Sequence, residues 1–259
     1  MKRLAVTLLA LCTTGALAFA GSDSKDMKQV ATTPPPPSCD YTWTGFYLGA
    51  HVGYGWGVGD TSFDPLPTPA GFGALDPESL GSNADGVFGG GQIGYNYQWN
   101  KLVFGVETDF SGADFSGTKH RSPIPQFGGG TTPNELTAHQ DTDWFGTFRG
   151  RLGFTPMCRL LLYGTGGLAF GHTHYFANTD FPGIDYAASS DETNVGWTAG
   201  GGLEYALSQH WSVKAEYLYV DLGDHGFTGN PDPVNPPFQV HYNAQTQEHT
   251  VNVGLNFKF

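Results

Sequence analysis

Two histidines separated by one residue, His172 and His174, have the spacing that most directly suggests chemistry in this sequence. Successive side chains of an extended strand point to opposite faces, so residues i and i+2 share a face and can approach one ion. Imidazole nitrogens bind transition metals and haem iron. The pair is therefore a hypothesis for metal or haem binding. Exposed histidines more often bind nothing, so we otherwise expect no cofactor.

Charged residues at alternate positions within apolar runs form a second candidate set. In the run Leu102–Phe115, Glu107 and Asp109 share one face while Val106 and Phe110 share the other. Charges on a common enclosed face would pair, because unpaired buried charges are costly. We expect these charged side chains to form a static polar plug in the interior of the fold. The alternative is a set of exchangeable salt bridges that lets small ions pass rarely. The set balances four acids against four bases: Glu107, Asp109, Glu204, Glu216, Arg149, Arg151, Lys214 and Lys258.

The first 20 residues have the form of a signal peptide for export. Lys2 and Arg3 are basic, residues 4–11 are apolar, and Ala18-Phe19-Ala20 matches a small-residue cleavage site. Residues 21–42 follow as a polar segment with four consecutive prolines at 34–37. We expect this segment to be a disordered, Pro-rich periplasmic leader.

Cys39 and Cys158 are the cysteines outside the signal peptide. Export would bring them to an oxidising compartment, where disulfides persist. We predict that they can form a disulfide that ties the leader across one end of the protein. Two separate thiols or an intermolecular bond are the alternatives.

Composition and motifs argue against two classes of function. The chain carries 12 Lys and Arg against 24 Asp and Glu, a formal charge of −12, so it lacks the basic face that nucleic acid requires. Neither the G-x-S-x-G pattern of hydrolases nor the H-E-x-x-H pattern of zinc proteases occurs. We therefore expect a protein that is not an enzyme and has no nucleic-acid partner.

Eight runs of alternating apolar and polar residues must position these side chains: 44–57, 87–99, 102–115, 142–154, 160–173, 193–207, 211–222 and 248–259. Each is long enough to cross a bilayer as a tilted strand, which takes about 9–11 residues. Short connections alternate with long polar ones, as they do in outer-membrane barrels and need not do in a soluble barrel. The short ones are 100–101, 155–159 and 208–210, and the long ones are 58–85, 116–140, 174–192 and 223–248.

The predicted fold is all-β: an eight-stranded antiparallel transmembrane up-and-down β-barrel over residues 43–259, with four long extracellular loops and three short periplasmic turns. Arg or Lys facing lipid at the midplane would cost about 2–4 kcal/mol, so the charged face should line the lumen. An even number of strands places both termini of the mature chain in the periplasm. Eight strands leave an interior that side chains fill, so we expect no open channel.

Six tryptophans are expected at the two membrane interfaces, where the indole ring contacts lipid and its N–H reaches water. They are Trp43, Trp99 and Trp211 at periplasmic strand ends, and Trp56, Trp144 and Trp197 toward the outer ends. The last run ends with four apolar residues that share one face: Val253, Leu255, Phe257 and Phe259.

Several segments of these runs carry recognisable motifs. Trp43-Thr44-Gly45-Phe46-Tyr47-Leu48-Gly49 opens the first run, and Gly150-Arg151-Leu152-Gly153 lies in the fourth. Together with residues 163–169, 212–221 and 249–259, they resemble the small alphaproteobacterial outer-membrane β-barrel family, often labelled porin-like. In architecture the chain is similar to the OmpA transmembrane domain and OmpX. The ending at Phe259 also resembles the signal read by the barrel-assembly machinery.

The resemblance implies a surface-exposed protein of the Gram-negative cell outer membrane. Family members are described variously as structural proteins, antigens, adhesins or haem binders. We expect a role in envelope integrity and surface presentation, with outer-membrane lipid, lipopolysaccharide and the barrel-assembly machinery as partners. A haem- or host-ligand-binding receptor or adhesin, and a low-conductance porin, are the alternatives.

Overall fold

Alternation of Val, Leu, Tyr and Phe with small or polar residues favours strands that have one apolar and one polar face. The structure is a computed structural model that describes residues 40–57, 59–66, 79–82, 84–121, 135–181, 184–232 and 239–259. These residues belong to one compact unit, Cys39–Phe259. The predicted signal peptide (1–20) and most of the predicted leader (21–42) lie outside the described residues.

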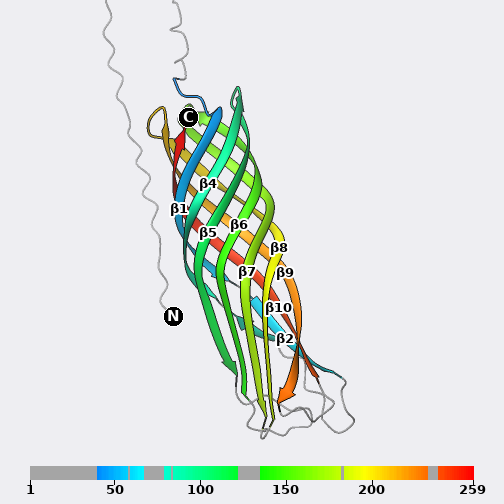
Figure 1. Cartoon of the computed structure of the whole chain (residues 1–259). Helices are drawn as coiled ribbons and strands as arrows, with labels where there is room; N and C mark the ends of the chain where they lie inside the picture. The colour runs from blue at the N-terminus through cyan, green and yellow to red at the C-terminus, as the bar shows by residue number, and fades with distance from the viewer. Residues whose placement is uncertain are drawn as a thin grey trace, which may run out of the picture. The chain divides into compact units, whose positions relative to one another are not determined.

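The described residues form ten β-strands: β1 (Gly45–Gly57), β2 (Gly59–Leu66), β3 (Ser79–Ser82), β4 (Asp85–Trp99), β5 (Leu102–Arg121), β6 (Glu135–Met157), β7 (Leu160–Phe181), β8 (Ile184–Ala206), β9 (Trp211–Asp232) and β10 (Gln239–Lys258). Eight of them, β1 and β4 to β10, pair antiparallel in chain order, and β1 also pairs with β10 (Figure 1). This last pairing closes the sheet into a ring. The prediction of an eight-stranded antiparallel barrel is confirmed.

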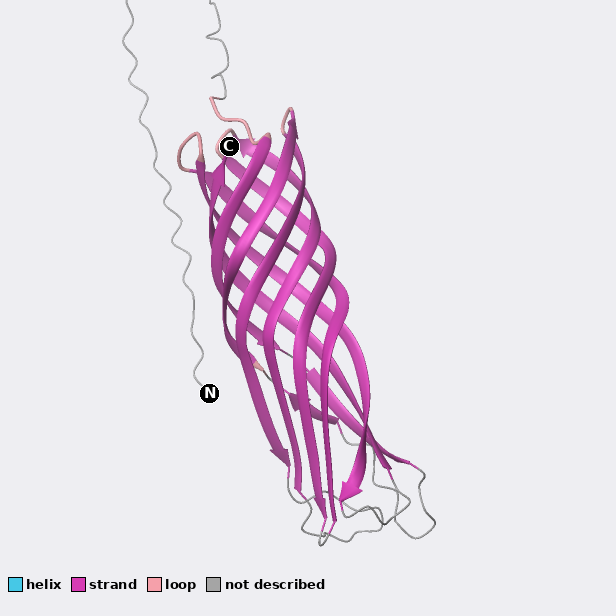
Figure 2. Cartoon of the chain, in the orientation of Figure 1, coloured by secondary structure: helices cyan, strands magenta, loops and turns pink. Residues whose placement is uncertain are grey.

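The two remaining strands, β2 and β3, lie in the first long connection. They pair with each other, and β2 also pairs with β10. Figure 2 shows strands and turns throughout the described part of the chain. No helix in that part is long and apolar enough to cross a membrane.

Seven of the eight barrel strands, all but β1, are longer than the sequence predicts. Strands β5 to β10 contain 20 to 23 residues each. The predicted loop 174–192 is largely strand, because β7 and β8 stay paired as far as Phe181 and Ile184. Paired strands also enter the predicted loops 116–140 and 223–248. Apolar alternation marks only the stretch that has an apolar outer face, whereas backbone hydrogen bonding continues beyond it.

The two faces of the ring differ in polarity in the sense opposite to a soluble barrel. Large apolar side chains point outward; Val253 of β10 is 53% exposed, whereas Asn256 on the inward face is 1% exposed. β7 is an exception in part, because Leu161 is buried toward the lumen while Leu162 is exposed. The inward face therefore carries the polar and charged residues that could do chemistry.

The end of the barrel with the short turns is closed by the residues that precede β1. Trp43 is 2% exposed and packs with Tyr41, Leu161 and Tyr163. Its indole N–H donates to the carbonyl of Cys158 at 3.2 Å. Trp43 is therefore not in an interface belt, and residues 40–42, predicted as part of a disordered leader, pack on the barrel.

The backbone conformation at the start of β1 explains this placement. Gly45 has φ +145°, a value that other residues rarely adopt, and it begins β1 directly after the inward-packed segment. Burial, with a smaller contribution from Glu204, raises the pKa of the Tyr41 hydroxyl to about 12, and Arg159 acts in the opposite direction.

Candidate functional site

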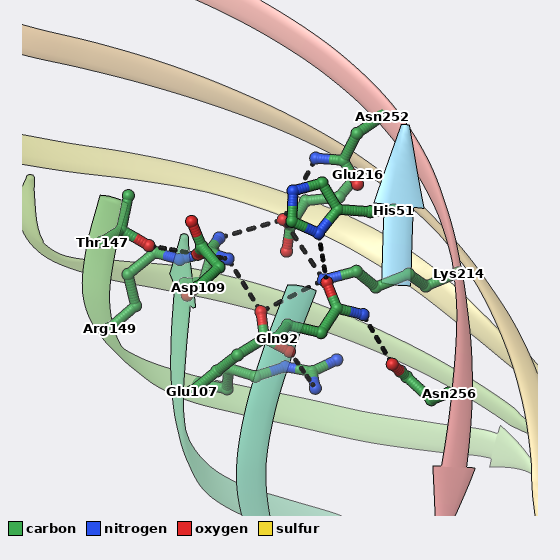
Figure 3. A network of polar contacts seen from close by, with 12 residues as sticks. His51, Gln92, Glu107, Asp109, Thr147, Arg149, Lys214, Glu216, Asn252 and Asn256 are labelled. Atoms are coloured by element: carbon green, nitrogen blue, oxygen red, sulfur yellow. Dashed lines mark hydrogen bonds and ion pairs between the residues drawn. The ribbon is translucent and has the colours of Figure 1, made fainter. Parts of the chain in front are cut away.

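Glu107 of β5 lies where side chains from four strands meet inside the barrel (Figure 3). One carboxylate oxygen, Oε1, accepts hydrogen bonds from Arg149 Nη2 at 2.7 Å and from Lys214 Nζ at 3.1 Å. The other, Oε2, accepts from the Tyr47 hydroxyl at 2.7 Å and from Arg151 Nη1 at 3.3 Å. Every oxygen of this buried carboxylate is therefore paired with a donor.

Arg149 of β6 connects Glu107 to two further carboxylates. Its Nη2 lies 2.9 Å from Asp109 Oδ2, and its Nη1 lies 3.0 Å from Glu216 Oε1. Thr147 also donates a hydrogen bond to Asp109. Strand register brings Glu107 and Arg149 together, because they are partners in the ladder between β5 and β6. One guanidinium thus joins β5 to β9 across the lumen.

Arg151 extends the network toward the end with the short turns. Its Nη2 donates to Glu204 Oε2 at 2.8 Å, and its guanidinium carbon lies 3.9 Å from the centroid of the Tyr163 ring. The other Glu204 oxygen accepts from the Ser212 hydroxyl at 2.6 Å and from Asn256 Nδ2 at 2.8 Å. Charge pairing at its edge and a cation–π contact on its face therefore hold this guanidinium in place.

Seven of the eight predicted lumen charges come together in this network, and Lys258 does not. The Lys258 ammonium donates to the carbonyl of Thr42 and lies 4.2 Å from the Tyr41 ring centroid. Since β10 ends at Lys258, its side chain reaches the mouth of the barrel and not the charged level inside. The network therefore contains four carboxylates and three bases, which is not the balance that the sequence predicts.

Neutral side chains complete the network, and two of them, Tyr163 and Gln92, were not selected by the sequence reasoning. The Tyr163 hydroxyl donates to Glu216 Oε2 at 2.9 Å, and Gln92 donates to Asn256. His51, which faces the lumen, contacts Gln92 Oε1 through Nδ1 at 2.9 Å. Strand alternation could have identified them, because each lies on the same face as the charged residues of its own strand or of the paired strand.

Close packing leaves little space at this level of the barrel. The cavity bordered by residues such as His51, Arg149, Lys214 and Glu216 has a volume of about 10 Å³, roughly what one water molecule requires. A β-carbon added at Gly202 would lie 2.7 Å from the Tyr163 hydroxyl, so the missing side chain makes room for this ring. The chemical role of this packed network is to hold opposite charges in fixed positions.

Apolar side chains adjoin the network on its other side. Phe88, Phe115 and Phe145 form one buried cluster, and Ala169, Leu218, Val220 and Leu222 form another. Three of these residues, Phe88, Phe145 and Leu218, border the same small cavity as Arg149. These apolar side chains lie between the charged network and the end of the barrel opposite the short turns.

The predicted histidine pair lies on the outward face of β7. The ring centroids of His172 and His174 are 4.9 Å apart, and Asp143 lies beside them. Haem binding by this pair stays a prediction.

Cys158 lies in the turn between β6 and β7 and is disulfide-bonded. Cys39, its predicted partner, lies outside the described residues. The pairing of these two cysteines therefore stays a prediction.

Comparisons with known proteins identify the family. A model of the outer membrane protein beta-barrel domain matches residues 4–259. The chain belongs to this family. It is 37% identical over 238 residues to the 31 kDa outer-membrane immunogenic protein of Brucella melitensis, covering 89% of this chain and 91% of the relative. It is 29% identical over 222 residues to the 22 kDa outer membrane protein of Rhizobium leguminosarum bv. viciae, covering 84% and 79%.

Among solved structures, the chain is similar to Ail, the attachment invasion locus protein of Yersinia pestis. The identity is 13%, the TM-score is 0.37, and the match covers 83% of this chain and 99% of that one.

Membership of an outer-membrane barrel family explains the outward aromatic residues. Trp99, Trp197 and Trp211 are 61%, 50% and 44% exposed, and Trp56 also points outward. Trp144 is half-buried on the same face, stacked against the ring of Phe110. In an outer-membrane barrel these rings would contact lipid and its headgroups.

The last strand of this outer-membrane barrel carries the predicted assembly signal on its lipid-facing side. Val253 and Leu255 are exposed there, and the terminal Phe259 is 69% exposed with its ring against that of Phe257. Its recognition by the assembly machinery stays a prediction.

Proposed function

We propose that this protein is a non-enzymatic outer-membrane barrel with a closed lumen. Its role is to support the structure of the envelope and to present its long connections at the cell surface. The observation that carries the proposal is the network around Glu107 and Arg149, which joins β1, β5, β6, β8 and β9 and encloses a cavity of about 10 Å³. A barrel braced in this way is suited to a rigid, non-conducting role.

Conductance of the purified full chain in a planar lipid bilayer tests this role. We expect the wild-type chain to show no stable channel openings, because the apolar level and the paired charges both oppose ion entry. An outer-membrane porin reconstituted in the same lipid is the positive control. Steady wild-type openings that change size in Glu107→Gln would overturn the proposal and favour the low-conductance pore.

The proposal includes an orientation in which the short turns face the periplasm and the long connections face outside. It also takes outer-membrane lipid and lipopolysaccharide as partners of the outward face. Support comes from the family, whose barrels place long connections outside. A protease site inserted at 208–210 should be protected in intact cells, and the same site inserted at 122–134 should be cut. The reverse pattern would overturn the orientation.

A further inference from the structure

An irregularity in β6 brings a carboxylate to the histidine pair of β7. The ladder between β6 and β7 passes from Thr142 to Trp144 and skips Asp143. Thr142 faces the lumen, whereas Asp143 and Trp144 both lie on the outer side. This is what a β-bulge does: it sends two consecutive side chains to one face. Asp143 therefore stands beside residues that strict alternation would separate from it.

Three possible ligand atoms converge at this bulge. Donor atoms of Asp143, His172 and His174 all lie within 4.8 Å of one another. His174 Nε2 is 3.0 Å from Asp143 Oδ2. The distances allow one ion to sit between the three side chains after small rotamer changes, since zinc–nitrogen and zinc–oxygen bonds are about 2.0–2.2 Å.

Neighbouring residues hold both imidazole rings. His172 stacks on Trp144 with ring centroids 6.0 Å apart and an interplanar angle of 11°. His174 Nδ1 contacts the carboxylate of Asp191 in β8. A carboxylate on one nitrogen of a histidine fixes the tautomer and turns the other nitrogen toward a metal. Here that other nitrogen is the one that faces Asp143.

We propose that Asp143, His172 and His174 bind one divalent transition-metal ion, with Asp191 as the residue that orients His174. Two imidazoles and one carboxylate suit Zn²⁺, Ni²⁺ or Cu²⁺, whereas Ca²⁺ and Mg²⁺ prefer oxygen ligands alone. Three protein ligands leave a fourth position for water or another molecule. The site lies on the outward wall beside Trp144, and it is independent of the closed-lumen role.

One further histidine and one further aspartate lie close enough to compete for the metal ion. His139 Nε2 pairs with Asp141 at 2.7 Å, and both line the same surface groove as His174 and Asp191. A site built on His139 instead would respond to a different set of substitutions. The experiment therefore needs His139→Gln beside the proposed ligands.

Titration of the purified full chain in detergent with Zn²⁺ by calorimetry tests the site, and Co²⁺ absorption reports its geometry. We expect one Zn²⁺ per chain, no competition by millimolar Mg²⁺, and cobalt bands of a four-coordinate ion. His172→Gln, His174→Gln and Asp143→Asn should each weaken Zn²⁺ binding at least about tenfold. Asp191→Asn should weaken it by roughly 10–100-fold without changing the stoichiometry.

His249→Gln is the matched control, because His249 also stacks on an outward tryptophan, Trp56, with centroids 5.9 Å apart. It and His139→Gln should leave Zn²⁺ binding unchanged. The proposal is overturned if the wild-type chain shows no saturable binding, if His174→Gln binds as the wild type does, or if His139→Gln removes the site. All variants are surface substitutions, and an unchanged heat-induced gel shift verifies that each has folded.

Discussion

Two buried glutamates, Glu107 and Glu248, face the same lumen in opposite circumstances. They are 1% and 2% exposed. Glu107 is held by Arg149 at 2.7 Å and Lys214 at 3.1 Å. Both carboxylate oxygens of Glu248 lack a hydrogen-bond partner among the residues that the structure describes. Equal burial therefore does not mean an equal contribution to stability.

Position along the barrel explains the difference. Glu107 is opposite Arg149 in the ladder, and Lys214 reaches it from β9. Glu248 is opposite Gly57 on one side and Val220 on the other, so its ladder partners carry no charge. A carboxylate removed from water needs a partner to offset the lost hydration. The lumen thus has one level where charges stabilise one another and another where a carboxyl group has no hydrogen-bond partner among the described residues.

The largest effect is expected from Glu107→Ala. Three bases would lose a shared partner inside the barrel, so the free energy of unfolding should fall by roughly 3–5 kcal/mol. Urea unfolding of the refolded chain in detergent, followed by tryptophan fluorescence, measures it. Lys258→Ala is the control, because that ammonium lies at the mouth and should cost less than about 1 kcal/mol. Equal losses in the two variants would contradict the pairing seen at Glu107.

A smaller effect of opposite sign is expected from Glu248→Gln. The substitution keeps the shape of the side chain and removes a charge that lacks a partner, so stability should equal or exceed that of the wild type by roughly 0–2 kcal/mol. The same urea titration checks this, with Glu216→Gln as the matched change at a paired glutamate. Destabilisation by Glu248→Gln as large as that by Glu216→Gln would mean that Glu248 has a partner.

The smallest effect concerns Tyr41 at the mouth, where burial raises the pKa of the hydroxyl to about 12. The unfolded chain should release this proton near pH 10. Its contribution to stability is therefore complete below pH 10 and is lost as the pH rises toward 12. Tyr41→Phe should match the wild type at pH 8 and lose less stability between pH 10 and 12. Identical decay of both proteins in that range would show that Tyr41 does not titrate with folding.

Much of the fold follows from local pattern. Alternation of Val251, Val253 and Leu255 with asparagine and glycine identifies a strand with one lipid-facing side, whatever the rest of the chain does. Strand ends were harder to predict, because β7 and β8 remain paired to Phe181 and Ile184 where the apolar alternation has already ended. Beyond the lipid-facing part of a strand, backbone pairing does not require apolar residues at alternate positions, so the sequence shows no periodic pattern there.

The sequence by itself determined eight strands, their inward and outward faces, and the presence of acids and bases in one lumen. Tertiary structure alone decided which charges meet, that Trp43 and Lys258 lie at the mouth, and that Asp143 joins the histidines. The physical reason is that the two kinds of property depend on different lengths of the chain. Parity is a property of one strand, but contacts across a closed barrel depend on the register of all its strands and on single bulges that shift it.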